Sequence, residues 1–230
     1  MNGRELAAVG ATRKVVATAK QHTASGTKGL VVHWAGRYDL LIWLLTFGRE
    51  RRFRERLLEP ARLQRGESVL DVGCGTGTLA IAANRRVGVG GSVHGIDASP
   101  EMIARARSKA KKAGAEVVFE NALAESLPFP DARFDVVLST VMLHHLPGAL
   151  RREAVREMRR VLKPGGRLLA VDFGGARGHG PGPLAHFHRH GHVDPRQLID
   201  LATDVGLRVV ESGPLGMWDL QFVLAEAPRA

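Results

Sequence analysis

The chain has 230 residues, of which 44% are hydrophobic and 24% are charged, so it suits a globular protein with one α/β domain and a short extension. Its single cysteine, Cys74, excludes a disulfide framework and favours a reducing compartment. No apolar run reaches 18 residues and no hydrophobic stretch follows a basic start, so we expect a cytoplasmic protein without a transmembrane segment.

The net charge of +10 is concentrated near the N-terminus. Residues 1–65 hold 13 Lys and Arg against 5 Asp and Glu, a balance of +8, and the rest of the chain carries only +2. Such an excess is typical either of a solvated, arginine-rich face or of a surface for anionic lipid, nucleic acid or acidic substrates. We favour the solvated face and keep a peripheral contact with anionic surfaces as the alternative.

The N-terminal extension has two parts. Residues 1–28 are polar and indicate a flexible tail. Residues 29–65 are predicted to form a helical cap, because the stretch 38–58 (YDLLIWLLTFGRERRFRERLL) is apolar first and basic afterwards. We rank three interpretations of it: a lid over the acceptor pocket with Tyr38 as a substrate contact, packing against the sheet edge, and a segment resting on a membrane surface.

Strands and helices alternate from residue 66 to the end of the chain. Short apolar runs such as DVVLS and RLLAV are typical of parallel strands buried on both faces, and the alternation predicts a doubly wound α/β fold. Strands are predicted at Ser68–Gly73, Ser92–Asp97, Glu116–Glu120, Phe134–Thr140, Gly166–Phe173, Leu207–Ser212 and Leu220–Glu226, and helices at Thr78–Arg86, Pro100–Ala113, Ala149–Leu162 and Pro195–Val205.

A glycine turn follows the first of these strands. Residues 69–80 read VLDVGCGTGTLA, with Asp71 ahead of Gly73, Gly75 and Gly77. Such a turn lets the backbone approach a ligand closely, but it closes one residue earlier than the dinucleotide fingerprint. Because the Asp71 carboxylate would repel a pyrophosphate and can hold an ammonium group, the turn favours an amino-acid-like cofactor over the nicotinamide dinucleotide of a dehydrogenase.

A second acidic residue ends the next strand. Asp97 closes SVHGID, 20 residues after Gly77, where a carboxylate can accept hydrogen bonds from both ribose hydroxyls. Ser99 and Pro100 then start a helix as its N-cap and first residue. Met102 in this helix either lies near the adenine face of a ligand or takes part in ordinary helix packing.

Three further motifs follow in order: LPFPDARFDVV, LHHL and RVLKPGG. Together with VLDVGCGTG and GIDASPEM they resemble the class I S-adenosylmethionine-dependent methyltransferases, over about residues 66–173. Within that superfamily the chain is similar to the ubiquinone/menaquinone C-methyltransferase branch.

The resemblance implies a fold, a cofactor and a site. The fold is a Rossmann-like seven-stranded sheet with the last strand antiparallel, in one domain over residues 66–230, and the cofactor is S-adenosyl-L-methionine. The expected activity is methyl transfer to a small, partly hydrophobic acceptor; the alternatives are a lipid or macromolecule methyltransferase that uses the basic N-terminal segment, and a non-catalytic cofactor-binding module. The cofactor-binding residues implied are Asp71, Gly73, Cys74, Gly75, Gly77, Asp97, Ala98, Met102, Ala122, Leu123, Ala124, Ser139 and Thr140.

Two positions depart from the family pattern. Leu123 stands where a polar residue often touches adenine, and His144-His145 replace the Arg-Asn pair that follows the fourth strand in quinone methyltransferases. The second departure argues against assuming a quinone acceptor. We predict that His145 is catalytic, since histidine titrates near neutrality, and that His144 binds substrate; the alternative is that one of the pair is packed and holds the loop.

A histidine-rich segment follows the fifth strand. His186, His188, His190 and His192 alternate and would share one face of an extended backbone. Because cysteines are absent and Asp194 is the one carboxylate nearby, we favour a loop near the substrate pocket, with His188 as a substrate contact, over a metal site. The sequence identifies neither the acceptor atom nor the oligomeric state.

Overall fold

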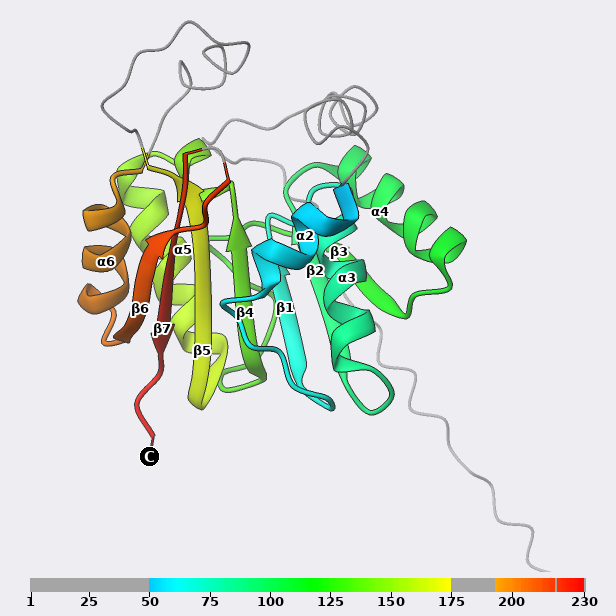
Figure 1. Cartoon of the computed structure of the whole chain (residues 1–230), viewed down its shortest axis with the longest axis horizontal. Helices are drawn as coiled ribbons and strands as arrows, with labels where there is room; N and C mark the ends of the chain where they lie inside the picture. Colours follow the sequence, from blue (N-terminus) through cyan, green and yellow to red (C-terminus); the bar gives the residue numbers. More distant parts are fainter. Residues whose placement is uncertain (1–49, 175–192, 218, 230) are drawn as a thin grey trace, which may run out of the picture.

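The computed structural model describes residues 50–174, 193–217 and 219–229. They form a seven-stranded sheet with helices on both faces (Figure 1). The strand order is β3-β2-β1-β4-β5-β7-β6, so β1 and β4 lie near the middle. The strands are β1 Ser68–Val72, β2 Ser92–Asp97, β3 Val117–Asn121, β4 Phe134–Thr140, β5 Leu162–Phe173, β6 Arg208–Pro214 and β7 Leu220–Glu226.

The predicted doubly wound fold and its direction reversal are confirmed. Strands β1 to β5 pair in parallel, whereas β7 is antiparallel to both β5 and β6. The helices are α2 Glu50–Leu58, α3 Thr78–Val87, α4 Pro100–Ala113, α5 Gly148–Val161 and α6 Pro195–Asp204, and a short 3-10 helix, η1, spans Leu143–His145.

The helices divide between the two faces of the sheet. Buried residues of α2, α3 and α4 join one hydrophobic cluster, and those of α5 and α6 join the other. Capping residues set several helix ends: the Ser99 hydroxyl accepts from Met102 N at 3.3 Å, Asp194 accepts from Arg196 N at 2.8 Å, and Gly114 ends α4 in the left-handed region at φ 60°.

One strand begins earlier than the sequence indicates. We predicted that Pro164, Gly165 and Gly166 form a turn before the fifth strand, but β5 begins at Leu162. Leu162 already pairs with Phe134, and the register then shifts before Arg167 pairs with Val136. The Pro-Gly-Gly segment is therefore an irregular part of the strand, where the missing N–H of Pro164 is tolerated at a bulge while Gly165 N still donates to the Ala227 carbonyl oxygen at 3.2 Å.

The described part of the N-terminal extension packs on the sheet domain. Phe53, Leu57 and Leu58 of α2 are buried in the same cluster as Leu79 and Ile81 of α3. For Glu50–Leu58 the packing interpretation therefore holds. The flexible tail at 1–28, the rest of the predicted lid with Tyr38, and the histidine segment with His188 lie outside the described residues. None of the described helices has the length and apolarity needed to cross a bilayer.

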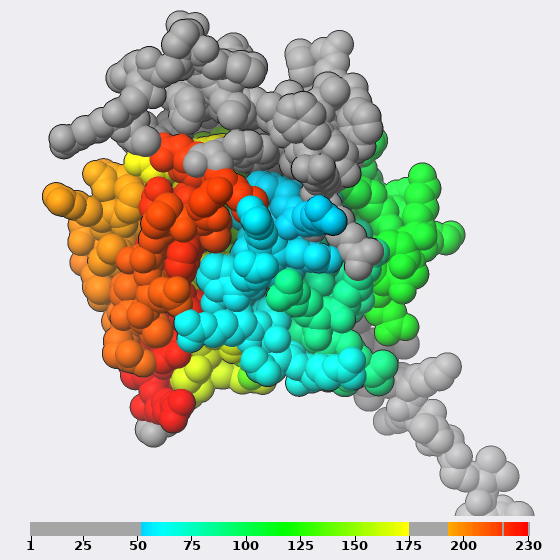
Figure 2. All heavy atoms as spheres, viewed as in Figure 1, coloured from blue at the N-terminus to red at the C-terminus, as the bar shows by residue number. Residues whose placement is uncertain are grey.

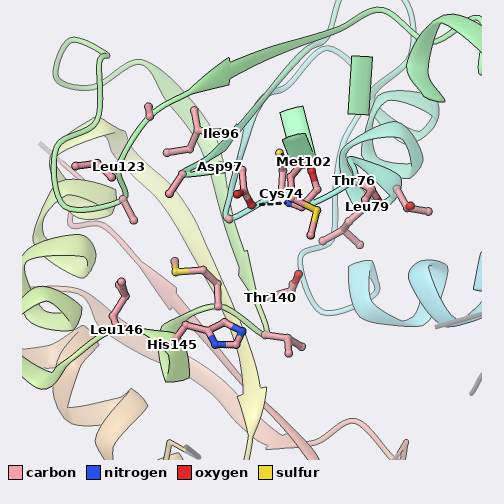
Figure 3. A pocket seen from close by; sticks show the side chains of 18 of the residues that line it. Cys74, Thr76, Leu79, Ile96, Asp97, Met102, Leu123, Thr140, His145 and Leu146 are labelled. Atoms are coloured by element: carbon pink, nitrogen blue, oxygen red, sulfur yellow. Dashed lines mark hydrogen bonds between the residues drawn. The ribbon is translucent and has the colours of Figure 1, made fainter. Parts of the chain in front are cut away.

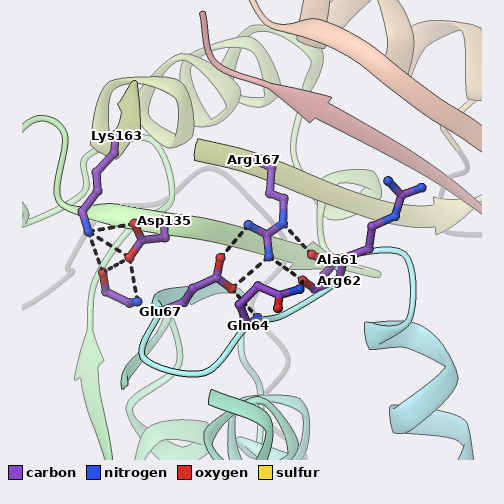
Figure 4. Close-up of polar contacts among 8 residues, drawn as sticks. Ala61, Arg62, Gln64, Glu67, Asp135, Lys163 and Arg167 are labelled. Carbon is purple, nitrogen blue, oxygen red and sulfur yellow. Dashed lines mark hydrogen bonds and ion pairs between the residues drawn. The ribbon is translucent and has the colours of Figure 1, made fainter. Parts of the chain in front are cut away.

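A network of ion pairs closes the end of the sheet where β1 begins (Figure 4). The Arg167 guanidinium donates to both carboxylate oxygens of Glu67 at 2.7 and 2.9 Å and to the backbone oxygens of Ala61 and Arg62. Beside it, the Lys163 ammonium donates to both oxygens of Asp135 at 2.8 Å. These contacts fix the loop that leads from α2 into β1.

Candidate functional site

A cleft lies at the carboxyl ends of the parallel strands, where α/β sheets bind ligands. It encloses about 1020 Å³ of empty space and opens to solvent. In Figure 3, Asp97, Cys74 and Met102 gather on one side of it and His145 and Leu146 on the other. The lining residues are Arg54, Gly73–Thr76, Thr78, Leu79, Ile96–Ala98, Met102, Ala122–Glu125, Thr140–Met142, His145 and Leu146.

Most of the predicted cofactor contacts meet in this cleft. Ten of the predicted residues line it: Gly73, Cys74, Gly75, Asp97, Ala98, Met102, Ala122, Leu123, Ala124 and Thr140. Asp71, Gly77 and Ser139 do not line it. Asp71 and Ser139 are each 1% exposed, and a Cβ on Gly77 would lie 2.6 Å from the Phe119 ring, so this glycine provides close packing beneath the turn.

The glycine turn adopts the conformation that the sequence suggests. Gly73, Gly75 and Gly77 all have positive φ, at 74°, 53° and 77°. A side chain on Gly73 would collide with Met142, whose Cγ lies 2.3 Å from the ideal Cβ position, whereas nothing lies within 4 Å of that position on Gly75. Gly75 therefore faces the open cleft, and its bare backbone lets a ligand approach.

Asp97 is held in place by two backbone amides. Its Oδ2 accepts from Gly75 N at 2.9 Å and its Oδ1 from Ser99 N at 2.8 Å. Burial raises the pKa of this carboxyl, and the two amides oppose that shift. Each carboxylate oxygen keeps a second lone pair, so the fixed carboxylate can accept two more hydrogen bonds from a neighbouring diol.

Asp71 is a buried carboxylate without a hydrogen-bond partner among the described residues. Burial raises its pKa to about 7, the Arg54 guanidinium lowers it, and Asp97 raises it further. Since an unsatisfied buried carboxylate is costly, a cation bound at the adjoining turn would relieve that cost. Arg54, on α2, lines the cleft and was not predicted, because its sequence context is an ordinary basic helix.

The two neighbouring histidines have different surroundings. His144 is 8% exposed, its Nδ1 lies 2.6 Å from Asp172 Oδ1, and its backbone N–H donates to Asp172 Oδ2 at 3.1 Å. Asp172 is fully buried at the end of β5 and also accepts from Phe173 N. Among the described residues His144 thus lies behind the cleft, held by the buried Asp172 carboxylate, and does not line it; its role as a substrate contact stays a prediction.

His145 is the histidine that lines the cleft. Its ring lies against that of His144, with 3.9 Å between the centroids, and its backbone N–H donates to the Met142 carbonyl oxygen at 3.0 Å. Asp172, His144 and His145 therefore form consecutive layers from the sheet to the cleft. Asp172 was missed in the sequence, although a lone carboxylate ending the apolar run RLLAVDF is a usable signal.

Val141, at the end of β4, has a φ of 53°, which is unusual for a β-branched residue. It lines the cleft, and its backbone N–H donates to the Val171 carbonyl oxygen at 2.7 Å. Backbone strain of this kind persists where surrounding structure enforces it and is frequent at binding sites. A valine in the sequence gives no signal of it.

The described residues contain no group of three His, Cys, Asp or Glu side chains arranged to hold a metal ion. Cys74 is a free, buried thiol whose pKa is raised by burial, so it stays protonated. The cleft therefore offers the fixed carboxylate of Asp97, a bare glycine turn with the buried Asp71 carboxylate behind it, and an apolar slot around Ile96, Met102 and Leu123. This donor set fits the ammonium, ribose and adenine groups of S-adenosylmethionine.

The segment that builds this cleft matches the model of a known protein family. Residues 69–166 match the family model described as a methyltransferase domain. The match contains the glycine turn, Asp97 and both histidines.

Similar proteins carry related names. The chain is 43% identical to the demethylmenaquinone methyltransferase of Thermus thermophilus over 139 residues, which are 60% of this chain and 62% of that protein. It is 37% identical to the ubiquinone/menaquinone biosynthesis C-methyltransferase UbiE of Cronobacter sakazakii, over 60% of this chain and 55% of that protein. The alignments thus span less than two thirds of these relatives.

Solved structures extend the similarity over more of the fold. A SAM-dependent methyltransferase from Aquifex aeolicus has a TM-score of 0.64 and 27% identity, covering 75% of this chain and 88% of that one. The [4+2]-cyclase SpnF has a TM-score of 0.66 at 22% identity, covering 78% and 81%. The second similarity concerns the fold alone.

Proposed function

We propose that this chain is an S-adenosylmethionine-dependent methyltransferase that acts on a small, partly hydrophobic acceptor. The proposal rests on two carboxylates at the same glycine turn. Asp97 is fixed by the amides of Gly75 and Ser99, and Asp71 is buried without a hydrogen-bond partner among the described residues. Asp97 would hold the ribose hydroxyls, Asp71 the ammonium group, and the slot around Met102 and Leu123 the adenine. When bound, the cofactor supplies an electrophilic methyl group on a sulfonium.

Transfer of this methyl group to an acceptor would require the acceptor atom to be held in line with the carbon–sulfur bond that breaks, and water to be kept out. The residues on the far side of the cleft from Asp97 can do both, because Val141, Met142 and Leu146 supply an apolar wall there. His145 is the titratable side chain of that wall, so it would orient a polar acceptor group or take its proton on a ring nitrogen. His144 and Asp172 would keep the His145 ring in place from behind.

The acceptor would be compact and largely apolar with one polar group near His145. A quinol ring fits that description, and two relatives are named for quinone substrates, so demethylmenaquinol is the first acceptor to test. His145 lines the cleft, whereas His144 is paired with Asp172, and this difference supports His145 as the polar anchor. We further infer action in the cytoplasm, consistent with a free cysteine in the cofactor cleft.

The decisive experiment is calorimetry of S-adenosylmethionine binding to wild type and Asp97→Ala. Losing two charge-assisted hydrogen bonds should cost about 1.5–3 kcal/mol, so donor affinity should fall at least about tenfold. Asp204→Ala, an exposed carboxylate at the end of α6, is the control with the same change of charge and should bind normally. Equal affinity in wild type and Asp97→Ala would exclude the ribose assignment.

A further inference from the structure

A second hollow lies between the outer faces of α3 and α4, beside α2. Figure 1 shows these three helices next to one another, and Figure 2 shows the surface that α2 and α3 present. The hollow encloses about 1110 Å³ of space and is open to solvent. Its lining residues recur at helical spacing: Thr78, Ile81, Ala82, Arg85 and Arg86 on α3, and Lys109, Lys112 and Ala113 on α4, with Arg54 and Glu55 on α2.

The floor of this groove is made by small side chains. Ala82 and Ala113 line it, one from each facing helix, and Ile81 is 6% exposed beneath. The small alanine side chains leave room between α3 and the C-terminal end of α4. The result is a concave site that can enclose a discrete chemical group.

The walls are strongly cationic. Five of the lining residues are Arg or Lys, and Glu55 is the one carboxylate among them. Arg85 and Lys112 form no ion pair with any residue in the described part of the chain. Lys109 instead donates to the Thr76 and Thr78 hydroxyls, and Arg86 to the Glu55 backbone oxygen at 3.3 Å. Cations from three helices therefore line the hollow, and two of them, Arg85 and Lys112, have no ion pair within the described part of the chain.

We propose that this groove binds a phosphate-bearing ligand, either a soluble phosphorylated compound or a phospholipid headgroup. Converging Arg and Lys side chains are the usual recognition groups for phosphate, and a concave floor distinguishes a held group from diffuse attraction to a surface. Arg54 and Thr78 line both this groove and the donor cleft. A bound phosphate group would therefore lie at the outer rim of the donor cleft, on a site separate from Asp97.

The groove is tested with a double charge reversal, Arg85→Glu/Lys112→Glu. The matched control, Arg152→Glu/Arg156→Glu, makes the same change of charge on exposed positions of α5, on the opposite face of the sheet. Two probes are measured with the full chain at low and physiological salt: inorganic pyrophosphate by calorimetry, and phosphatidylcholine vesicles with and without phosphatidylglycerol by co-sedimentation. The groove variant should lose at least tenfold in affinity and the control less than twofold.

The two probes identify the source of the phosphate. Pyrophosphate binding indicates a soluble phosphorylated ligand, and binding that needs phosphatidylglycerol indicates a lipid headgroup; either supports the groove if the reversal abolishes it. Thermal melts and the milder Arg85→Gln/Lys112→Gln variant show whether a loss reflects unfolding. Wild type that binds neither probe, or equal losses in both double variants, would overturn the proposal.

Discussion

Polar side chains at the two ends of the central strands differ in how they are hydrogen-bonded. Where β1 and β5 approach the α2 loop, the Arg167 guanidinium donates four hydrogen bonds, to Glu67 and to two backbone oxygens. At the carboxyl ends, the carboxylate of Asp71 and the hydroxyl of Ser139 are buried with no hydrogen-bond partner among the described residues. The ion-pair network where the strands begin therefore stabilises the fold, and the polar groups at the carboxyl ends remain available to bind a ligand.

Residues with positive φ lie at both ends, and Arg62 and Ala132, near the beginnings of β1 and β4, have φ of 50° and 53°. At the carboxyl ends Gly73, Gly75, Gly77 and Val141 all have positive φ, and valine is strained there. Such strain costs about 1–3 kcal/mol for a residue like Val141, and the rest of the fold has to compensate for it. Substitutions at the two ends should thus affect different quantities: ligand affinity and turnover at one, the free energy of unfolding at the other.

The largest effect is expected from Gly75→Val. A side chain at this position meets no protein atom within 4 Å and would occupy the space of the donor, so binding should be lost while the circular-dichroism spectrum stays that of the folded protein. Gly114→Val is the matched control: its φ of 60° and its open surroundings resemble those of Gly75, but it caps α4 away from the cleft. A Gly75→Val protein that binds S-adenosylmethionine normally would show that the turn does not contact the ligand.

His145→Ala should reduce turnover by about two orders of magnitude and leave donor affinity unchanged, since general-base assistance typically contributes about 100- to 10,000-fold. His144→Ala should instead lower the free energy of unfolding by about 1.5–3 kcal/mol, because Asp172 would lose a charge-assisted partner. Steady-state kinetics with the identified acceptor measure the effect of His145→Ala, and denaturant titration measures the effect of His144→Ala. Near-normal turnover of His145→Ala would leave catalysis to positioning alone.

Arg167→Leu tests the opposite end. Arg167 and Glu67 are mostly buried, with 16% and 15% of their side chains exposed, so removing the guanidinium should lower the free energy of unfolding by about 2 kcal/mol without changing donor affinity. Arg208→Leu breaks a more exposed pair with Glu226 and should cost less than about 1 kcal/mol. If both variants are equally stable, the network in Figure 4 does not hold the α2 loop.

The smallest change in donor affinity is expected from the titration of Asp71. Its pKa is raised from 3.8 to about 7, so the folded state keeps a proton that the unfolded state has released, and stability should fall as pH rises from about 4 to about 7. A bound ammonium group favours the ionised form, so donor affinity should rise by up to about tenfold between pH 6 and 7. Calorimetry across this range checks it, and Asp71→Asn should abolish both trends. A flat profile in wild type would contradict the assignment.

The sequence predicted the fold well because its signals are local. Strands β2, β4 and β7 and helix α4 have the predicted bounds, since apolar runs, Ser99 with Pro100, and glycine after the helix all mark them. The start of β5 was missed, because Pro164 and Gly165 usually end regular structure and only pairing across the sheet shows that they continue it.

The cofactor side of the site was also predictable, whereas the acceptor side was less so. Motif residues such as Gly75 and Asp97 carry their chemistry in the sequence, and the structure brings them together. Which of the two histidines faces the cleft depends on Asp172, 27 residues after His145, and on the geometry of η1. Arg54 and Val141 line the cleft through packing that no local pattern specifies.

The place of β7 in the sheet has a consequence for synthesis. Residues Leu220–Glu226 insert between β5 and β6, which therefore have no direct contact through backbone hydrogen bonds. While the chain is growing from its N-terminus, β1 to β4 can already pair, but β6 has no partner and the apolar edge of β5 stays open until β7 leaves the ribosome. The half of the sheet that holds the glycine turn can thus mature first, and the nascent chain is exposed to edge-to-edge aggregation until its last strand arrives.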